Sequence, residues 1–302
     1  MKILITGATG LIGSELVRKC LTDNIEVNYL TTSKEKIKKE KHFKGFFWNP
    51  NKEEIDLACL EGVSAIIHLA GASIAKRWTP SYKEKIVKSR TETTRLLYKA
   101  LIESKNNSVK QIISASGISI YPSSFETYYH EDFAEVDDSF LGEVVEVWEN
   151  AADKFKMQNI KVAKIRTGLV LSTSGGVLEP IVKTVKYGVG APLASGKQWQ
   201  SWIHIDDITG IYLHVLKNTL EGVYNAVAPQ PVTNKEMTKE VATQLHRFVW
   251  PINVPKFMLK LVLGQMSYLV FSSQKVAANK VIESGYSFKF SSLKEALADV
   301  LK

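Results

Sequence analysis

The stretch MKILITGATGLIG spans residues 1–13. Its apolar run Ile3-Leu4-Ile5 is typical of a strand buried on both faces, and glycines follow at positions 7, 10 and 13. From Leu11 to Leu21 the apolar residues recur at the spacing of a helix with one buried stripe. The free amides at the start of such a helix can bind a diphosphate where glycine permits close approach. The stretch therefore predicts a dinucleotide-binding loop.

Strand and helix patterns alternate through the next 150 residues. Further strands are expected at 25–30, 46–48, 65–69, 111–116 and 160–165, with long helices at 80–103 and 139–156. This alternation predicts an α/β fold with a Rossmann-like, doubly wound parallel sheet whose ligands bind at the carboxyl ends of the strands. We expect a NAD(P)-binding domain over 1–230, with substrate-side loops around 170–200, and a small, mainly helical carboxy-terminal region over 231–302.

Shorter elements are expected beyond Gly168. They are a helix at 177–186, a helix running to Lys217 and capped by Asp206 or Asp207, a strand at 223–226, and a helix at 234–246 capped by Thr233 or Asn234. The last helix is introduced by the capping-box pattern Ser292-x-x-Glu295.

The end of the second strand bears on the choice of cofactor. An Asp or Glu there would bind the 2′-hydroxyl of NAD and repel a 2′-phosphate. The sequence instead has Thr31-Thr32-Ser33-Lys34, whose hydroxyls and positive charge favour NADP. NAD remains the alternative, and Thr32 and Ser33 could also cap the helix expected after them.

The formal net charge of +8 comes largely from the run KEKIKKEKHFK at 34–44. A solvated helix face explains this run better than a nucleic-acid surface, because no aromatic residues are interleaved as a stacking platform would require. Attraction of a phosphate-bearing ligand is the functional alternative. We therefore expect a small-molecule substrate, no nucleic-acid partner, and a monomer or homodimer.

Two cysteines, Cys20 and Cys59, stand apart without the spacing of a metal site, so we expect no metal and a reducing compartment. No signal-peptide pattern is recognised at the start, and the apolar stretch 257–271 is only fifteen residues long and contains Lys260. These features predict a cytoplasmic protein with no membrane partner.

Eight segments together resemble one family. They are ITGATGLIG from Ile5, HLAGASIAKRWT from His68, KSRTETTRLL from Lys88, ISASGISIY from Ile113, VWENAA from Val147, IRTGLVLSTSGG from Ile165, GKQWQSWIHIDD from Gly196, and VIESGYSFKFSSLKEALADVL from Val281. They span nearly the whole chain in order. The chain resembles the extended short-chain dehydrogenase/reductase superfamily, and within it the atypical branch of NAD(P)-binding "epimerase family" (sugar-nucleotide epimerase-like) proteins with a DUF1731-like carboxy-terminal region.

The resemblance implies a set of cofactor contacts. Relatives in this branch often have an arginine where Thr32 stands in this chain. By similarity, the pyrophosphate would be contacted by Gly7, Thr9, Gly10, Leu11, Ile12 and Gly13, and the 2′ side by Thr32 and Ser33. The adenosine and ribose would be contacted by Leu69, Ala70 and Gly71, and the nicotinamide end by Arg166 and Gly168.

The superfamily's usual catalytic pair is a Tyr and a Lys four residues later, in the helix after the fifth strand. The ammonium favours the phenolate and so adapts a tyrosine, with an ordinary pKa of about 10, to acid/base work. With Glu149 as the anchor, Leu141 and Val145 occupy these positions, and neither can move a proton. The branch that the chain resembles shares this gap.

Three other residues are candidates for proton transfer. Ser116 and Tyr121 follow the fifth strand, and His204 lies in the tryptophan-rich block. A structural hydrogen bond is the alternative for His204. His68 lies inside an apolar strand and is expected to be a core histidine.

Two functions fit these features. The first is a NAD(P)-dependent oxidoreductase or epimerase, with NADP favoured, acting on a small polar, sugar-like or other carbonyl or hydroxyl substrate without the Tyr-Lys pair. The alternative is a catalytically silent NADP(H)-binding sensor or scaffold.

Overall fold

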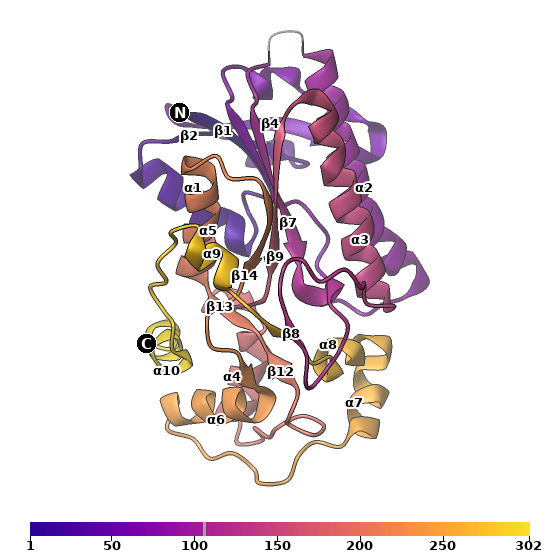
Figure 1. The fold of residues 1–302 in the computed structure, drawn as a ribbon, viewed down its shortest axis with the longest axis vertical. Helices are drawn as coiled ribbons and strands as arrows, with labels where there is room; N and C mark the ends of the chain where they lie inside the picture. Colours follow the sequence, from indigo (N-terminus) through magenta and orange to yellow (C-terminus); the bar gives the residue numbers. More distant parts are fainter. Residues whose placement is uncertain (105–106) are drawn as a thin grey trace.

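The computed structural model describes residues 1–104 and 107–302. Its centre is a mostly parallel sheet with the strand order β14-β9-β7-β6-β1-β2-β4-β3, and β5 pairs with β4 (Figure 1). The strands are β1 (Lys2–Thr6), β2 (Glu26–Thr31), β3 (Lys39–Glu40), β4 (Phe43–Asn49), β5 (Glu54–Ile55), β6 (Ala65–His68), β7 (Gln111–Gly117), β9 (Lys161–Thr167) and β14 (Gly222–Ala226). The order β4-β2-β1-β6-β7-β9 is that of a doubly wound nucleotide-binding sheet, which confirms the predicted fold class.

Helices cover both faces of the sheet (Figure 1). One layer contains α1 (Leu11–Thr22) and α5 (Ile205–Lys217), and the other contains α2 (Pro80–Glu103) and α3 (Phe140–Asp153). Side chains of β1 alternate between the two cores: Ile3 and Ile5 pack with residues of α1 and α5, whereas Leu4 packs with residues of α2. A strand covered on both faces must be apolar throughout, which is why its sequence shows no alternation.

Smaller elements, most of them from the second half of the chain, lie in the lower half of Figure 1, whereas α9 is drawn near its middle. The additional strands and helices are β8 (Tyr128–Tyr129), β10 (Leu169–Ser172), β11 (Gly175–Gly176), β12 (Trp199–Gln200), β13 (Trp202–His204), β15 (Val232–Thr233), β16 (Lys275–Val276), α4 (Leu178–Lys186), α6 (Asn234–Gln244), α7 (Lys256–Leu263), α8 (Tyr268–Phe271), α9 (Asn279–Glu283) and α10 (Leu293–Val300). Short 3-10 helices are η1 (Lys34–Lys36), η2 (Pro50–Lys52), η3 (Leu57–Leu60), η4 (Ile118–Ile120), η5 (Lys154–Gln158) and η6 (Gly264–Ser267).

A third apolar core joins several of these elements. Leu178 of α4 and Trp202 of β13 pack in it with Met237 of α6 and Leu297 of α10. Residues of the 170–200 loops, which the sequence assigns to the first domain, therefore share a core with the carboxy-terminal helices. The division into 1–230 and 231–302 stays a prediction.

Three local expectations were wrong. The basic run 34–44 is not a helix face: η1 is followed by β3 and β4, which pair antiparallel through Lys39 and Lys44. Helix α10 does begin after Ser292, but the Ser292 side chain makes no capping hydrogen bond. The strand predicted at 46–48 is β4, which is longer and covers Phe43–Asn49. Its start is extended because Tyr29 of β2 stacks on Phe43 at a centroid distance of 4.4 Å.

Of the two residues predicted to cap α6, Thr233 and Asn234, the structure has Thr233 as the cap. Its hydroxyl accepts a hydrogen bond from the Glu236 amide, and the Glu236 carboxylate accepts one from the Thr233 amide. Within the described residues, every helix is too short or too polar to cross a membrane.

Candidate functional site

The loop after β1 is held by contacts that only glycine permits. Gly7 has φ +70°, and a Cβ on it would lie 2.9 Å from the Leu69 carbonyl carbon. A Cβ on Gly13 would lie 2.1 Å from the Gly7 carbonyl oxygen. Real side chains never approach that closely, so α1 packs directly on the loop because residue 13 is glycine. The close packing places the start of α1 next to the end of β6.

The amino end of α1 is open to a ligand. Its N-cap is Gly10, which has no side chain to bond the first amides of the helix. These amides therefore keep their hydrogen-bonding capacity, and the helix dipole adds a partial positive charge. This geometry suits a diphosphate.

The neighbouring loop after β6 is fixed by Thr6. The Thr6 hydroxyl oxygen accepts hydrogen bonds from the amides of Leu69 and Ala70, each at 3.1 Å, and lies 2.7 Å from His68 Nδ1. His68 is fully buried, and burial lowers its pKa to about 3, with the charge of Arg90 acting in the same direction. His68 is therefore a neutral core residue, as predicted.

Arg90 of α2 contacts the loop after β6 and helps to hold it, a role that the sequence did not predict. Its guanidinium donates to the Ala72 carbonyl at 3.2 Å, and a Cβ on Gly71 would lie 3.2 Å from its Cζ. The guanidinium also lies 4.9 Å from the ring of Trp148. Burial lowers the pKa of Arg90 to about 10, so the group stays charged at neutral pH. The motif KSRTETTRLL contains this arginine, but only the fold brings it to the end of β6.

A cavity of about 430 Å³ opens beside the glycine loop. Thr9 and Ser14 line it on the side of α1, and Lys36 and Lys38 line it on the side of η1. The Tyr29 hydroxyl donates to the Lys36 carbonyl at 2.6 Å and accepts from the Lys38 amide at 2.8 Å, which fixes the two lysines at the rim. The full lining is Ala8, Thr9, Ser14, Val17, Tyr29, Glu35, Lys36, Lys38 and Phe43.

The cavity lining departs from the predicted 2′ side. Thr32 and Ser33 precede η1 and are not among the lining residues. The Thr31 side-chain oxygen, not that of Thr32 or Ser33, bonds the Ser33 amide, at 3.2 Å. The sequence signal for Lys36 and Lys38 is the charge run at 34–44, for which attraction of a phosphate-bearing ligand is the alternative to a solvated surface.

A buried ion pair occupies the ends of β7 and β9. Arg166 donates from Nε to Glu149 Oε1 at 2.8 Å and from Nη2 to Oε2 at 3.1 Å, and Ser116 donates to the same Oε1 at 2.6 Å. Lys164 adds a further cation at 3.3 Å from Glu149. Burial raises the pKa of Glu149, but the hydrogen bonds and charges of these partners lower it more, so its pKa lies below its ordinary value.

Tyr121 belongs to the same network. Its hydroxyl donates to Asn225 Oδ1 at 2.8 Å and accepts from Arg166 Nη1 at 2.9 Å. The side chain is fully buried, and burial raises its pKa to about 12 against the opposing effect of Arg166. The structure thus brings together Ser116, Tyr121 and Arg166. Their hydrogen bonds to Glu149 and Asn225 also stabilise the fold.

The predicted Tyr and Lys positions lie beside this network. Leu141 and Val145 are both buried on α3. Val145 Cγ2 would lie 3.6 Å from a Cβ on Gly117, at the end of β7. Gly168 likewise has a packing role, because a Cβ there would lie 2.3 Å from the Ser201 carbonyl oxygen.

His204 is placed elsewhere, at the start of α5. It is the N-cap of this helix: Nδ1 accepts from the Asp206 amide at 3.1 Å, so the expected caps Asp206 and Asp207 were wrong and both lie in the first turn. The ring lies 3.9 Å from Phe290, and Nε2 lies 3.4 Å from Asp299 Oδ2. Burial lowers the pKa of His204 against the opposing charge of Asp206.

The three predicted acid/base residues are therefore not assembled in one place. Among the described residues, no hydrogen bond joins His204 to Ser116 or Tyr121. The assignment of Ser116, Tyr121 and His204 to proton transfer stays a prediction. In the same part of the chain, no group of three or more His, Cys, Asp or Glu side chains is arranged to hold a metal ion.

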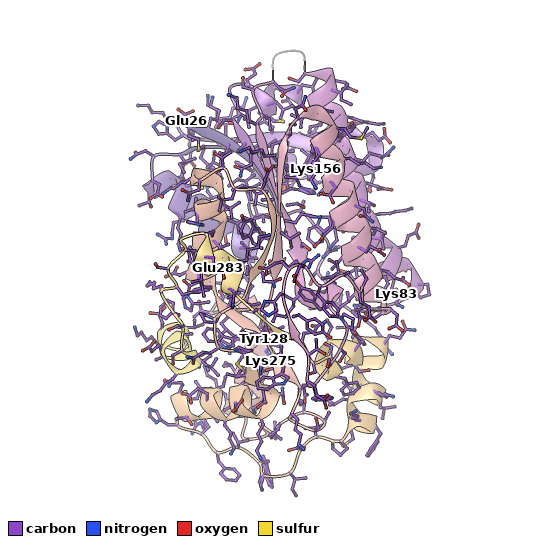
Figure 2. The ribbon with its side chains drawn as sticks, viewed as in Figure 1. Glu26, Lys83, Tyr128, Lys156, Lys275 and Glu283 are labelled. Atoms are coloured by element: carbon purple, nitrogen blue, oxygen red, sulfur yellow. The ribbon has the colours of Figure 1, made fainter. Side chains whose placement is uncertain are left out.

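A cation between two aromatic rings links the carboxy-terminal segment to the loop after β7. Figure 2 shows Tyr128 of β8 and Lys275 of β16 close together, where these strands pair in parallel. Lys275 Nζ lies 5.4 Å from the ring of Tyr128 and 4.5 Å from that of Trp199. Lys275 therefore connects β16 to both β8 and β12.

Comparisons with known proteins agree with this architecture. The model of the "NAD dependent epimerase/dehydratase family" matches residues 3–228, and that of "Domain of unknown function (DUF1731)" matches residues 254–300. The chain is similar to epimerase family protein SA0724 of Staphylococcus aureus (strain N315), with 35% identity over 302 residues that cover 99% of this chain and 98% of that protein.

Two solved structures extend the comparison. A crystal structure of human epimerase family protein SDR39U1 (isoform 2) with NADPH has a TM-score of 0.86 and 29% identity, covering 99% of both chains. UDP-glucuronic acid 4-epimerase from Bacillus cereus, in complex with UDP-glucuronic acid and NAD, has a TM-score of 0.80 and 18% identity over 99% of this chain and 98% of that one. The second shows a shared fold alone.

The ion pair at Glu149 predicts a pH-dependent stability. Glu149→Gln leaves Arg166 buried without its carboxylate, and we expect the free energy of unfolding near pH 7 to fall by about 3 kcal/mol. Because the folded pKa of Glu149 is lowered, its contribution is present above the unfolded pKa and lost as pH falls through the folded pKa. Urea denaturation at a series of pH values should therefore show the gap between wild type and variant narrowing in acid.

Glu146→Gln is the matched control, since Glu146 is exposed on the same helix. It should change stability by less than about 0.5 kcal/mol at every pH. An equal loss in both variants, or a gap that stays constant with pH, would contradict the assignment of a buried charged pair.

Proposed function

The chain belongs to the NAD dependent epimerase/dehydratase family, and from this we propose that it is an NADP(H)-dependent oxidoreductase or epimerase acting on a small polar carbonyl or hydroxyl compound. The observation that carries the proposal is the open helix end at Gly10, next to a loop where a Cβ on Gly13 would lie 2.1 Å from the Gly7 oxygen. Such a loop lets a diphosphate approach the main-chain amides closely.

We assign cofactor contacts to the two loops that the close packing brings together. The glycine loop and the start of α1 would hold the pyrophosphate, and the loop after β6 would lie against the adenosine and ribose. Strands β7 and β9 end where the nicotinamide would lie. The proposed residues are Gly7, Thr9, Gly10, Leu11, Ile12, Gly13, Thr32, Ser33, Leu69, Ala70, Gly71, Arg166 and Gly168.

NADP is favoured over NAD by the charges at the cavity beside the glycine loop. Lys36 and Lys38 line it and would pair with a 2′-phosphate. Glu35 also lines it and acts against this preference, so the two lysines must outweigh one carboxylate. The human relative whose structure contains NADPH supports the same choice. NAD stays the alternative cofactor.

The bound cofactor would accept or supply a hydride, and the chain must supply the proton. Ser116, Tyr121 and His204 are the proposed donors. Burial raises the pKa of Tyr121 to about 12, so its hydroxyl keeps its proton at neutral pH, and the charge of its hydrogen-bond partner Arg166 opposes this rise. His204 is neutral above its lowered pKa and could act as a base.

A second function is favoured by the apolar positions on α3. Leu141 and Val145 replace the usual pair, and the Tyr121 hydroxyl is already bonded to Asn225 and Arg166. A protein with these contacts can bind NADP(H) and report its redox state to a partner without turnover. Turnover of a substrate would support the enzyme, and NADPH binding without turnover would support the sensor.

Titration calorimetry with NADPH and a variant of Gly10 tests the proposed diphosphate site at the start of α1. This residue has φ −82° and ψ 176°, a conformation that Asp adopts well at a helix N-cap. A Cβ there would lie 3.3 Å from the Gly7 carbonyl oxygen, so Gly10→Asp should fold after a small shift of this loop. Its carboxylate would occupy the place of the diphosphate, and we expect the dissociation constant to rise at least tenfold. Gly10→Asn has the same shape without the charge and should bind more tightly than Gly10→Asp. Equal affinity for NADPH in wild type and Gly10→Asp would refute the site.

The ratio of NADPH to NADH affinity tests the lysines. Lys36→Glu and Lys38→Glu should each reduce NADPH affinity about tenfold and leave NADH affinity within about twofold, because only NADPH has the 2′-phosphate. Lys41→Glu is the control, since Lys41 is exposed and does not line the cavity. An equal loss of affinity for NADPH and NADH would show that the 2′-phosphate does not bind at these lysines.

Absorbance of NADPH during incubation with small polar carbonyl compounds tests turnover. For an active enzyme, Tyr121→Phe or His204→Asn should lower kcat by about tenfold or more. Asn is a good N-cap, so His204→Asn removes the titratable group while keeping the cap of α5. Tight NADPH binding with no turnover of any carbonyl compound would support the sensor instead.

A further inference from the structure

One end of the molecule exposes large apolar side chains. We define the apolar tip as Tyr187 and Val189 after α4, Phe248, Trp250 and Ile252 after α6, and Phe257, Met258, Leu261 and Val262 on α7. Most are far more exposed than usual for such residues: Leu261 is 83% exposed, Ile252 75%, Tyr187 74%, Val262 72%, Phe257 71% and Phe248 69%. Figure 1 shows α7 and the chain between α6 and α7 at the end of the long axis away from the N-terminus.

The loop part of the tip has a defined backbone. Trp250 donates from its amide to the Gly190 carbonyl at 2.9 Å and from its indole to the Gly188 carbonyl at 2.7 Å. The Val254 amide bonds the Pro192 carbonyl at 2.9 Å. Residues 188–192 and 250–254 therefore run side by side, and their side chains are presented from a fixed surface.

Helix α7 continues this surface without a buried residue of its own. Phe257 and Leu261 lie four residues apart, as do Met258 and Val262, so two apolar rows run along adjacent faces. Only Leu259 and Leu263 of this eight-residue helix are half-buried, so most of its apolar surface faces away from the protein. Its apolar faces need another partner.

The charge of the tip has one sign. Between residues 241 and 282 the sequence has no Asp or Glu, and the same holds between 180 and 205. Arg247, Lys256 and Lys260 lie among the exposed apolar residues. Within residues 1–104 and 107–302, none of these three takes part in an ion pair.

We propose that the apolar tip binds the surface of an anionic phospholipid bilayer. Exposed aromatic and aliphatic side chains interleaved with Lys and Arg are the pattern of interfacial binding, in which the apolar groups enter the headgroup boundary and the cations meet lipid phosphates. The exposed Trp250 suits that boundary. A second copy of the chain fits less well, because a symmetric contact would bring the cations of the two tips together.

This inference goes beyond the proposed function and differs from the sequence-based expectation of no membrane partner. That expectation rested on the length needed to cross a bilayer, which α7 lacks. Lying on a bilayer surface needs only one exposed apolar face with flanking positive charge.

Vesicle sedimentation of the full chain tests the proposal. The protein should sediment with vesicles of equal parts phosphatidylglycerol and phosphatidylcholine at low salt, and less with phosphatidylcholine alone or at high salt. The double variant Leu261→Asp, Val262→Asp should weaken binding at least tenfold. Lys256→Glu with Lys260→Glu should also weaken it at least tenfold and remove most of the salt dependence.

Met157→Asp is the matched control, because Met157 is 79% exposed on η5, outside the tip. It should bind vesicles as the wild type does. Quenching of tryptophan fluorescence by brominated lipid should be reduced in Trp250→Phe, which places the contact at the tip. Retained NADPH binding in the tip variants shows that they are folded.

Two outcomes would overturn the proposal. One is the absence of sedimentation with phosphatidylglycerol vesicles at low salt, or an equal effect of Met157→Asp. The other is a concentration-dependent dimer that Leu261→Asp with Val262→Asp dissociates while vesicle binding is absent, which would make the tip an interface between copies.

Discussion

The close packing of α1 on the loop after β1 is the constraint on which the rest of the structure depends. The separation between Gly13 and the Gly7 oxygen leaves no room for a side chain, and Gly7 in turn meets the Leu69 carbonyl. Two strand ends are thereby held against one helix end. The open amides of that helix, the loop held by Thr6, and the cavity rimmed by Lys36 all follow from where this contact places them.

The second determinant is the buried charge at the ends of β7 and β9. Arg166 has its guanidinium committed to Glu149 and Tyr121, and Ser116 donates to the same carboxylate. A buried pair of this kind costs desolvation energy and is weak evidence for stability by itself, but removing one partner is strongly destabilising. The network therefore fixes the geometry beside the proposed nicotinamide position, and it includes Ser116 and Tyr121, two of the three proposed proton donors.

The sequence predicted what local rules determine. The apolar runs and the glycine spacing identified β1, α1 and the doubly wound sheet, because a strand buried on both faces and a helix with one apolar stripe have distinctive patterns. It could not show that His204 caps α5 with its ring, that Arg90 reaches the loop after β6, or that Lys36 rims a cavity. Each of these depends on contacts across long sequence separations or on a turn whose direction periodicity does not encode.

The lysines that give the chain its excess positive charge have different neighbours along the sequence and in the folded structure. Along the chain, the run at 34–44 looks like a solvated surface, and the lysines at 256 and 260 look like interruptions in a nearly apolar segment. In three dimensions Lys36 and Lys38 of the first run line the cavity beside the open end of α1, and the second group lies among exposed apolar side chains with no acidic residue in its segment. Neighbouring cations repel one another and are retained at a cost to the folded state, and within the described part of the chain only Lys38 among those named has a carboxylate partner, Glu40 at 3.8 Å. Two separate concentrations of them, each next to a surface of distinct chemistry, are best explained by two different anionic ligands.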